Sequence, residues 1–170
     1  MKELEESFLK AHESHSNQIF RFIFFKLGDR EKAKELTQET FMKTWIHISK
    51  NGEIENIRSF LYRVAGNLVI DEYRRNGRAS SISLDYLTEE GYDFSNDEKE
   101  SYVDRIDGAQ ILELLKSLPD SYSEVLFMRY VEELDIIEIA DSIGESNNVV
   151  SVRLNRGIKK LKEMVKDKIK

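Results

Sequence analysis

Apolar residues recur at intervals of three and four along most of this 170-residue chain, which is the spacing of one face of an α-helix. The clearest stripe lies within residues 29–48 and contains Leu36, Phe41 and Trp45. The chain has one proline and eight glycines, so few residues interrupt such helices. The sequence therefore predicts an all-α fold that is built from long helices.

Three helical patterns fill the first part of the chain. Residues 8–27 form an unusually aromatic stretch that ends at Gly28, and residues 29–48 carry the stripe described above. A third pattern begins after Asn56, which can cap a helix, and ends near residue 76. We predict that residues 1–79 form one small helical domain.

Residues 80–109 differ in composition from what precedes them. This segment has nine acidic and two basic residues and is rich in serine, aspartate and glutamate. Connections of this length are uncommon inside a compact domain. We predict an acidic, flexible linker between two domains, and we expect its charge to repel DNA.

The second domain is predicted over residues 110–170 as a four-helix unit. Pro119 ends its first helix, and Ser121 has the spacing of a helix cap for the next one. A short helix over 136–143, a turn at Gly144 and a longer helix capped by Ser146 follow. This order of a short helix, a turn and a longer helix is typical of a helix-turn-helix.

The last predicted helix is strongly basic, with eight Lys or Arg residues against two acidic ones over 149–170. One side is apolar and includes Gly157, where only a small residue allows close helix approach. Arginine can bind guanine and asparagine can bind adenine in a major groove. A basic surface helix without a DNA function is the alternative. The residues predicted to contact duplex DNA are Asn148, Ser151, Val152, Arg153, Asn155, Arg156 and Lys159.

The third helix of the first domain also has a polar side, which lies close in sequence to the predicted loop 50–55. Arginine and asparagine side chains can hold single-stranded DNA by its backbone and can pocket a flipped base. An ordinary solvated helix face is the alternative interpretation. The candidate residues are Lys50, Asn51, Arg63, Asn67, Arg74 and Arg75.

Several classes of protein are disfavoured by what the sequence lacks. It has no cysteine, no histidine cluster with metal-ligand spacing and no glycine-rich phosphate loop. We therefore expect no enzyme, no metal site and no cofactor. The apolar stretches fall short of the about 20 residues that span a bilayer, and the first six residues are acidic rather than a basic, apolar signal. A cytoplasmic protein without membrane insertion is predicted.

Two groups of motifs resemble bacterial sigma factors. Residues 36–45 (LTQETFMKTW), 59–68 (SFLYRVAGNL) and 71–75 (DEYRR) resemble conserved region two, and residues 118–119 and 149–161 resemble region four. The short chain without a middle domain is similar to the extracytoplasmic-function, or group IV, class. The resemblance implies a promoter-specificity subunit that directs transcription initiation.

The resemblance also implies partners and sites. The second helix would bind the clamp helices of the largest subunit of core RNA polymerase, and the second domain would bind its flap region. The third helix would hold the melted promoter strand, with Asn67 near the flipped base, and the last helix would read duplex promoter DNA. Members of this class are commonly held inactive by an anti-sigma factor. The residues implied in core-polymerase binding are Glu35, Gln38, Glu39, Met42 and Lys43.

Two other classes of function remain open at the level of sequence. A conventional helix-turn-helix regulator would bind duplex operators as a dimer, although no dimerisation heptad is present. A protein-interaction module of helical hairpins would leave the basic face merely solvated. Association with core polymerase followed by transcription in vitro separates these classes from a sigma factor.

Overall fold

The computed structural model describes residues 1–77 and 108–169, and within these ranges the chain is helical with turns and no strand. Contacts divide the chain into two compact units. The first consists of Met1–Arg78 and Ile137–Gly144, and the second consists of Ala79–Ile136 and Glu145–Lys170. The predicted all-α fold with two helical bodies is confirmed, whereas the predicted domain boundaries stay predictions. Most of the predicted linker lies outside the described residues, and a helix already begins at Gly108.

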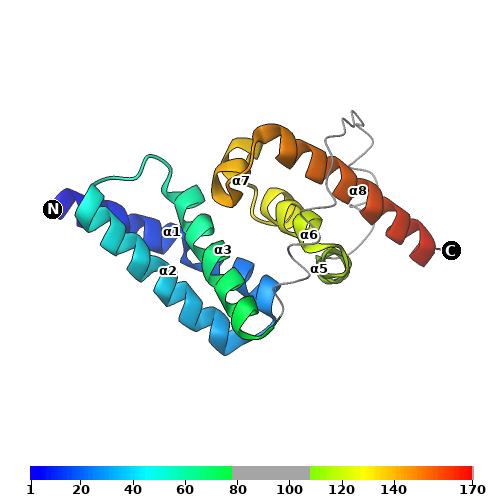
Figure 1. Ribbon diagram of the computed structural model, residues 1–170, viewed down its shortest axis with the longest axis horizontal. Coiled ribbons are helices and arrows are strands. Elements are labelled where there is room, and N and C mark those ends of the chain that lie inside the picture. The colour runs from blue at the N-terminus through cyan, green and yellow to red at the C-terminus, as the bar shows by residue number, and fades with distance from the viewer. Residues whose placement is uncertain (78–107, 170) are drawn as a thin grey trace. The chain divides into compact units, whose positions relative to one another are not determined.

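Helices α1 (Lys2–Leu27), α2 (Arg30–Asn51) and α3 (Ile57–Arg75) pack against one another in all three pairs (Figure 1). Their shared core is aromatic and aliphatic. Phe22 of α1 meets Tyr62 of α3 edge to face, with ring centroids 5.4 Å apart, and neither side chain is exposed. Burying aromatic residues of this size contributes a large share of the stability of a small helical body. Other core residues include Ile19, Ile23, Ala33, Leu36, Leu61 and Val69.

The ends of these helices follow the predicted capping residues. Gly28 ends α1 with φ 71°, and its N–H donates to the Phe24 carbonyl. Asp29 accepts a hydrogen bond from the Lys32 N–H at 3.1 Å, and Asn56 caps α3 in the same way. The predicted helix end at Gly28 and the predicted cap at Asn56 are therefore confirmed, and the cap at Asp29 is an addition from the structure.

Two boundaries differ from the predictions. Helix α1 begins at Lys2, six residues before the expected start, and Glu3 and Glu5 lie in its first turn. Acidic side chains there interact favourably with the helix dipole. Helix α2 continues to Asn51 and ends at Gly52, which has φ 86°. The apolar stripe that located α2 stops three residues earlier, so the stripe alone underestimates the helix.

Two buried threonines explain how the inner side of α2 tolerates hydroxyl groups. Thr40 and Thr44 have no exposed surface. Their hydroxyls donate to the carbonyls of Leu36 and Thr40, at 2.7 and 2.8 Å. Each buried hydroxyl therefore has a partner inside its own helix, and α2 loses no free energy to an unsatisfied donor.

The C-terminal end of α3 is fastened to both other helices of the unit. The Tyr73 hydroxyl donates to the Lys26 carbonyl at the end of α1. Glu72 is 8% exposed and lies 3.8 Å from the Lys32 ammonium of α2 and 3.7 Å from the Arg75 guanidinium. These contacts fix the direction of α3 relative to α1 and α2.

The second half of the chain carries helices α5 (Gly108–Ser117), α6 (Asp120–Leu126), α7 (Ile136–Ile143) and α8 (Asn147–Ile169). Helix α6 continues directly into a π-helix, η2 (Phe127–Val131). The predicted cap at Ser121 is wrong, because α6 begins one residue earlier and Ser121 is buried within it. The predicted cap at Ser146 is confirmed, since its hydroxyl accepts from the Val149 N–H at 3.1 Å.

Within the second unit, α8 packs on α6 and α5. The closest approach is at Gly157, where an added Cβ would lie 2.9 Å from Leu126 Cδ1 and 3.2 Å from Tyr122 Cβ. Real Cβ atoms essentially never lie within 3.0 Å of such a neighbour, and a distance of 3.2 Å is tighter than most of their contacts. The sequence-based prediction that only a small residue fits at Gly157 is therefore confirmed.

We expect Gly157→Ala to destabilise the second unit by about 1–3 kcal/mol, because α8 would have to move away from α6. Gly66→Ala in α3 is the matched control, since an added Cβ there meets nothing within 4 Å. The control should be neutral or stabilising by up to about 1 kcal/mol. Urea denaturation followed by circular dichroism measures both, and equal midpoints for the two variants would contradict the packing described.

Candidate nucleic-acid interface

The outward side of α2 is set by its buried side. Ala33, Leu36 and Phe41 face the core of the unit, which leaves the opposite side of the helix to solvent. All five residues that sequence reasoning implicated in polymerase binding lie on the accessible side, with Glu39 half-buried and the others exposed. These residues are Glu35, Gln38, Glu39, Met42 and Lys43.

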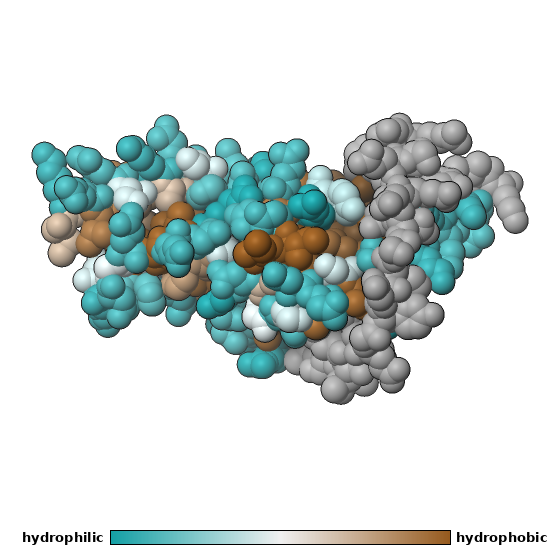
Figure 2. Space-filling view, turned by 90° about the horizontal axis from the view of Figure 1, so that it is seen from above, coloured by the Kyte–Doolittle hydropathy of each residue, from teal (hydrophilic) through white to brown (hydrophobic). Residues whose placement is uncertain are grey.

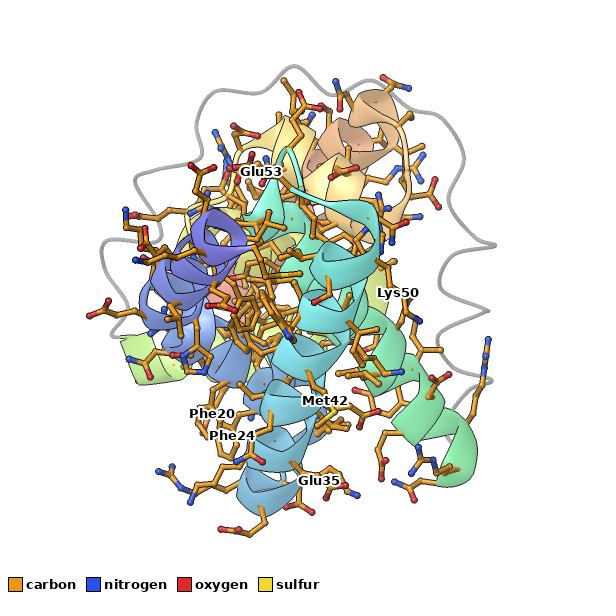
Figure 3. All side chains as sticks on the ribbon, turned by 90° about the vertical axis from the view of Figure 1, so that its left-hand side faces the viewer. Phe20, Phe24, Glu35, Met42, Lys50 and Glu53 are labelled. Carbon is orange, nitrogen blue, oxygen red and sulfur yellow. The ribbon has the colours of Figure 1, made fainter. Side chains whose placement is uncertain are left out.

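This side of α2 combines an apolar centre with charged neighbours. Met42 is 62% exposed, and Ile46, one turn further along, is 46% exposed. Lys43 lies 4.0 Å from Glu39 on the same helix. Figure 3 shows Glu35 and Met42 along α2, with Lys50 towards its end. Sequence reasoning did not include Ile46, although its spacing of four from Met42 places it on the same stripe.

Helix α3 likewise has a buried and an exposed side. Leu61, Tyr62 and Leu68 are buried. Arg63, Asn67, Arg74 and Arg75 are all exposed. With 100° of rotation per residue, the side chains of Arg63, Asn67 and Arg74 project within about 40° of one another around the helix axis. The structure therefore brings Arg63, Asn67 and Arg74 together along one side of α3, with Arg75 on its flank.

Lys50 and Asn51 are exposed, as expected, but they belong to the last turn of α2 rather than to a loop. The Asn51 amide donates to the His47 carbonyl at 3.1 Å, which is a contact within the helix end. The connection between α2 and α3 is consequently shorter than predicted and covers residues 52–56. The two side chains are held by a helix, so their positions are more restricted than those of a loop.

Sequence reasoning missed two residues at the start of α3. Arg58 binds Glu138 of α7 through two hydrogen bonds, at 2.9 and 2.7 Å. The Ser59 hydroxyl donates to Asp141 of the same helix at 2.5 Å. These residues are about 80 positions apart in the chain, so no local pattern predicts the contacts.

Helix α8 presents a narrower polar side than the sequence predicted. Asn148 and Lys159 are exposed, and Ser151, Asn155 and Arg156 are half-buried. Val150, Leu154 and Ile158 are buried, as predicted for the apolar side. The accessible polar residues are therefore Asn148, Ser151, Asn155, Arg156 and Lys159.

Val152, which was predicted on the polar side of α8, and Arg153, which was predicted on its flank, are both buried. Val152 is 5% exposed and Arg153 is 2% exposed. The Arg153 guanidinium lies 3.6 Å from the Glu145 carboxylate. A helical wheel divides a helix into two halves, but the buried arc of α8 is wider than half of its circumference.

No group of three or more His, Asp or Glu residues in residues 1–77 and 108–169 is arranged to hold a metal ion. None of the described helices is long and apolar enough to cross a membrane. Figure 2 shows a face on which hydrophilic residues predominate and apolar residues gather in small groups.

Comparison with protein families decides the identity of the chain. The model of Sigma-70 region 2 matches residues 11–79, and the model of Sigma-70, region 4 matches residues 108–161. Together these matches cover most of the chain. The chain is an extracytoplasmic-function (ECF) sigma factor. It is thus a promoter-recognition subunit of RNA polymerase, and the resemblance inferred from the sequence motifs is confirmed.

Known sigma factors are similar along nearly the whole chain. The ECF sigma factor SigM of Bacillus subtilis is 30% identical over 81% of this chain and 83% of its own length. YlaC of the same organism is 30% identical over 93% of this chain and 91% of its own length. SigW of the same organism is 25% identical over 96% of this chain and 91% of its own length.

A solved structure supports the fold. The sigma factor RpoE of Bartonella quintana, solved in complex with the anti-sigma factor NepR, matches with a TM-score of 0.69. It is 19% identical, and the match covers 95% of this chain and 98% of that one. At this identity the likeness concerns the fold alone.

We expect Arg153→Ala to lower the free energy of unfolding of this sigma factor by about 1–3 kcal/mol, because it removes a buried side chain and the partner of Glu145. Lys166→Ala, at an exposed position of the same helix, should change it by at most about 0.5 kcal/mol. Urea denaturation measures both. A fully stable Arg153→Ala variant would show that Arg153 is not a structural residue.

Proposed function

We propose that this sigma factor uses three separate helix sides to bind the clamp helices, the melted promoter strand and duplex promoter DNA, and that its second domain makes a fourth contact. The exposed side of α2 binds the clamp helices of core RNA polymerase, and the polar side of α3 with the end of α2 holds the melted promoter strand. The polar side of α8 reads duplex promoter DNA, while the second domain contacts the flap region. The proposal rests on the agreement between the region 2 match, over residues 11–79, and the exposed polar sides of α2 and α3.

The α2 surface has the make-up of a protein interface. Exposed apolar side chains such as Met42 and Ile46 form its centre, and Glu35, Glu39 and Lys43 surround them. Apolar anchors within a charged rim are typical of residues that dominate binding energy. Because the inner side of α2 is packed against α1 and α3, the surface is presented on a stiff support.

The α3 surface suits a single strand. Guanidinium groups of Arg63 and Arg74 bind phosphates, and the Asn67 amide can hydrogen-bond the edge of an unstacked base. Extruding a base costs a few kcal/mol. Binding the single-stranded form offsets that cost, so opening the promoter requires no nucleotide hydrolysis by this subunit.

The α8 surface suits a major groove. Asn148, Asn155 and Arg156 offer the amide and guanidinium groups that read adenine and guanine, and Lys159 adds a cation for the backbone. Val152 and Arg153 were part of the sequence-based set, but their burial makes them the weakest members of it. Ser151 and Asn155 define a reading side particular to this chain, so the promoter sequence has to be selected experimentally.

The proposed role is that of a cytoplasmic DNA-binding regulatory subunit without a catalytic step of its own. We also propose that an anti-sigma protein holds the chain inactive by covering the exposed side of α2. Support for this comes from the position of Met42 and Ile46, since such apolar residues suit a second protein as well as the polymerase. Competition between the two partners for one surface would then regulate the subunit.

Reconstitution with the cognate core RNA polymerase tests the proposal directly. The holoenzyme should select promoter fragments from a DNA library and produce run-off transcripts with defined starts, whereas core enzyme alone should not. The free chain should bind the selected promoter only weakly. Tight, specific binding of duplex DNA by a dimer of the free chain would favour a conventional regulator instead.

Met42→Glu should weaken binding to core polymerase by about tenfold or more, since it places a charge at the apolar centre of the interface. Leu9→Glu is the matched control, because Leu9 is 63% exposed on α1 and lies outside the proposed surface. Both variants should unfold like the parent chain. Competition for core enzyme against a fluorescent sigma factor gives the two affinities. An equal loss of affinity in both variants would contradict the assignment of the exposed side of α2 to polymerase binding.

A further inference from the structure

We propose that Asn76, at the C-terminal end of α3, is a site of spontaneous deamidation that limits the working life of this sigma factor. The chain contains two Asn-Gly dipeptides, Asn51–Gly52 and Asn76–Gly77, and each lies at the end of a helix. The structure protects the first dipeptide and leaves the second open to the reaction. The consequence for function rests on the proposed role of α3 in holding the promoter strand.

Deamidation of an Asn-Gly dipeptide needs water and no other reactant. The backbone nitrogen of Gly77 loses its proton and attacks the side-chain carbonyl carbon of Asn76. A C–N bond forms, the bond to the amide nitrogen breaks, and that nitrogen takes up a proton and leaves as ammonia. Water then opens the succinimide ring at either carbonyl, which gives aspartate or isoaspartate. Glycine favours ring closure because it has no Cβ beside its nitrogen and restricts the backbone least.

At Asn51–Gly52 both reacting groups are engaged in the end of α2. The Gly52 N–H donates to the Ile48 carbonyl at 2.8 Å, and the Asn51 side-chain amide donates to the His47 carbonyl at 3.1 Å. Asn51 is the last residue of the helix, so the ring closes only after this helix end has opened. Because opening costs free energy, the rate falls in proportion to the fraction of molecules that are open.

Asn76–Gly77 lies beyond the last helical residue of α3, and both residues are exposed. The Gly77 N–H donates to the Arg74 carbonyl at 3.3 Å, which is long for a backbone hydrogen bond. Asn76 has left the helical conformation, with φ −94° and ψ 5°, and Gly77 has φ 73°. Residues at a helix end open at little cost in free energy. The Gly77 nitrogen therefore reaches its target far more often than the Gly52 nitrogen does.

The product places a negative charge beside the proposed promoter-strand site. Asn76 directly follows Arg74 and Arg75, whose exposed side chains belong to that site. A carboxylate at this position repels the phosphates of a strand, and it interacts unfavourably with the free carbonyl groups at the end of α3. Isoaspartate also inserts a methylene group into the main chain. Both products weaken the hold on the strand, so an aged chain opens promoters less well than a newly made one.

Peptide mapping by mass spectrometry tests the site itself. The full-length chain is incubated in mildly alkaline buffer, and Asn76 should convert about tenfold or more faster than Asn51. In the urea-unfolded chain the two residues should convert at rates within about threefold of each other, because both precede glycine and no structure protects either. Equal rates in the folded chain would overturn the proposal. A tenfold difference that persists in urea would also contradict it, because the difference would then come from the sequence alone.

Variants assembled into holoenzyme test the consequence. Asn76→Asp reproduces one product, and its run-off transcription should fall about threefold below that of the parent, because one negative charge is added near the strand. Asn17→Asp adds the same charge at an exposed position of α1 and is the matched control, which should transcribe like the parent. No loss in Asn76→Asp, or an equal loss in Asn17→Asp, would contradict the consequence.

Ageing of the chain before assembly joins the two measurements. Loss of transcription by the parent should follow the fraction converted at Asn76. Asn76→Gln keeps an amide, but its larger ring closes much more slowly, so this variant should retain its activity through the same incubation. An equal loss in Asn76→Gln would overturn the proposal.

Fresh parent holoenzyme separates the failure of this inference from the failure of the proposed function. If the fresh holoenzyme transcribes and ageing at Asn76 has no effect, deamidation does not limit the sigma factor. If the fresh holoenzyme makes no transcript, the proposed function fails, and the mass measurement still decides whether Asn76 is the modified residue.

Discussion

The aromatic core of the first three helices, centred on the edge-to-face packing of the fully buried Phe22 and Tyr62, decides which sides of α2 and α3 face solvent. Once the apolar stripes of the first three helices are buried against one another, the opposite sides of these helices must face solvent. Met42 and Glu35 then lie outward on α2, and Asn67 lies outward on α3. The proposed binding surfaces of this sigma factor are thus a consequence of its core, and a change in the core would reorient those surfaces even where every surface residue is kept.

Periodicity and capping predicted much of the fold from the sequence. The caps at Asn56 and Ser146 and the left-handed turn at Gly28 depend on residues within a few positions of one another, so a local pattern contains the information. The small residue at 157 was predicted from its place on the apolar stripe, although the residues that require it, Leu126 and Tyr122, are more than 30 positions away. The start of α1 at Lys2 was missed because its first turns carry mostly polar residues. Val152 and Arg153 were misplaced because the width of a buried arc depends on every neighbour of α8.

The contacts between α3 and α7 show the limit of such reasoning most clearly. Arg58 and Glu138 look like ordinary surface residues in the sequence, and each has closer partners of opposite charge along the chain. Only the tertiary structure pairs them, because an ion pair across 80 positions leaves no periodic signal. The family motifs likewise located the modules, but the sequence could not indicate that Glu138 and Asp141 would bind side chains at the start of α3.

The tie between the Tyr73 hydroxyl and the Lys26 carbonyl has a mechanical meaning. In the proposed function, a strand bound at Arg74 would pull on the end of α3. The Tyr73 hydrogen bond would pass that load to α1, and the Glu72 ion pair would pass part of it to Lys32 of α2. The three helices would therefore move as one rigid unit, and the end of α3 would not fray under the load. Such a rigid unit could keep apart two strands that have separated by thermal motion, whereas a helix that frayed would let them reanneal.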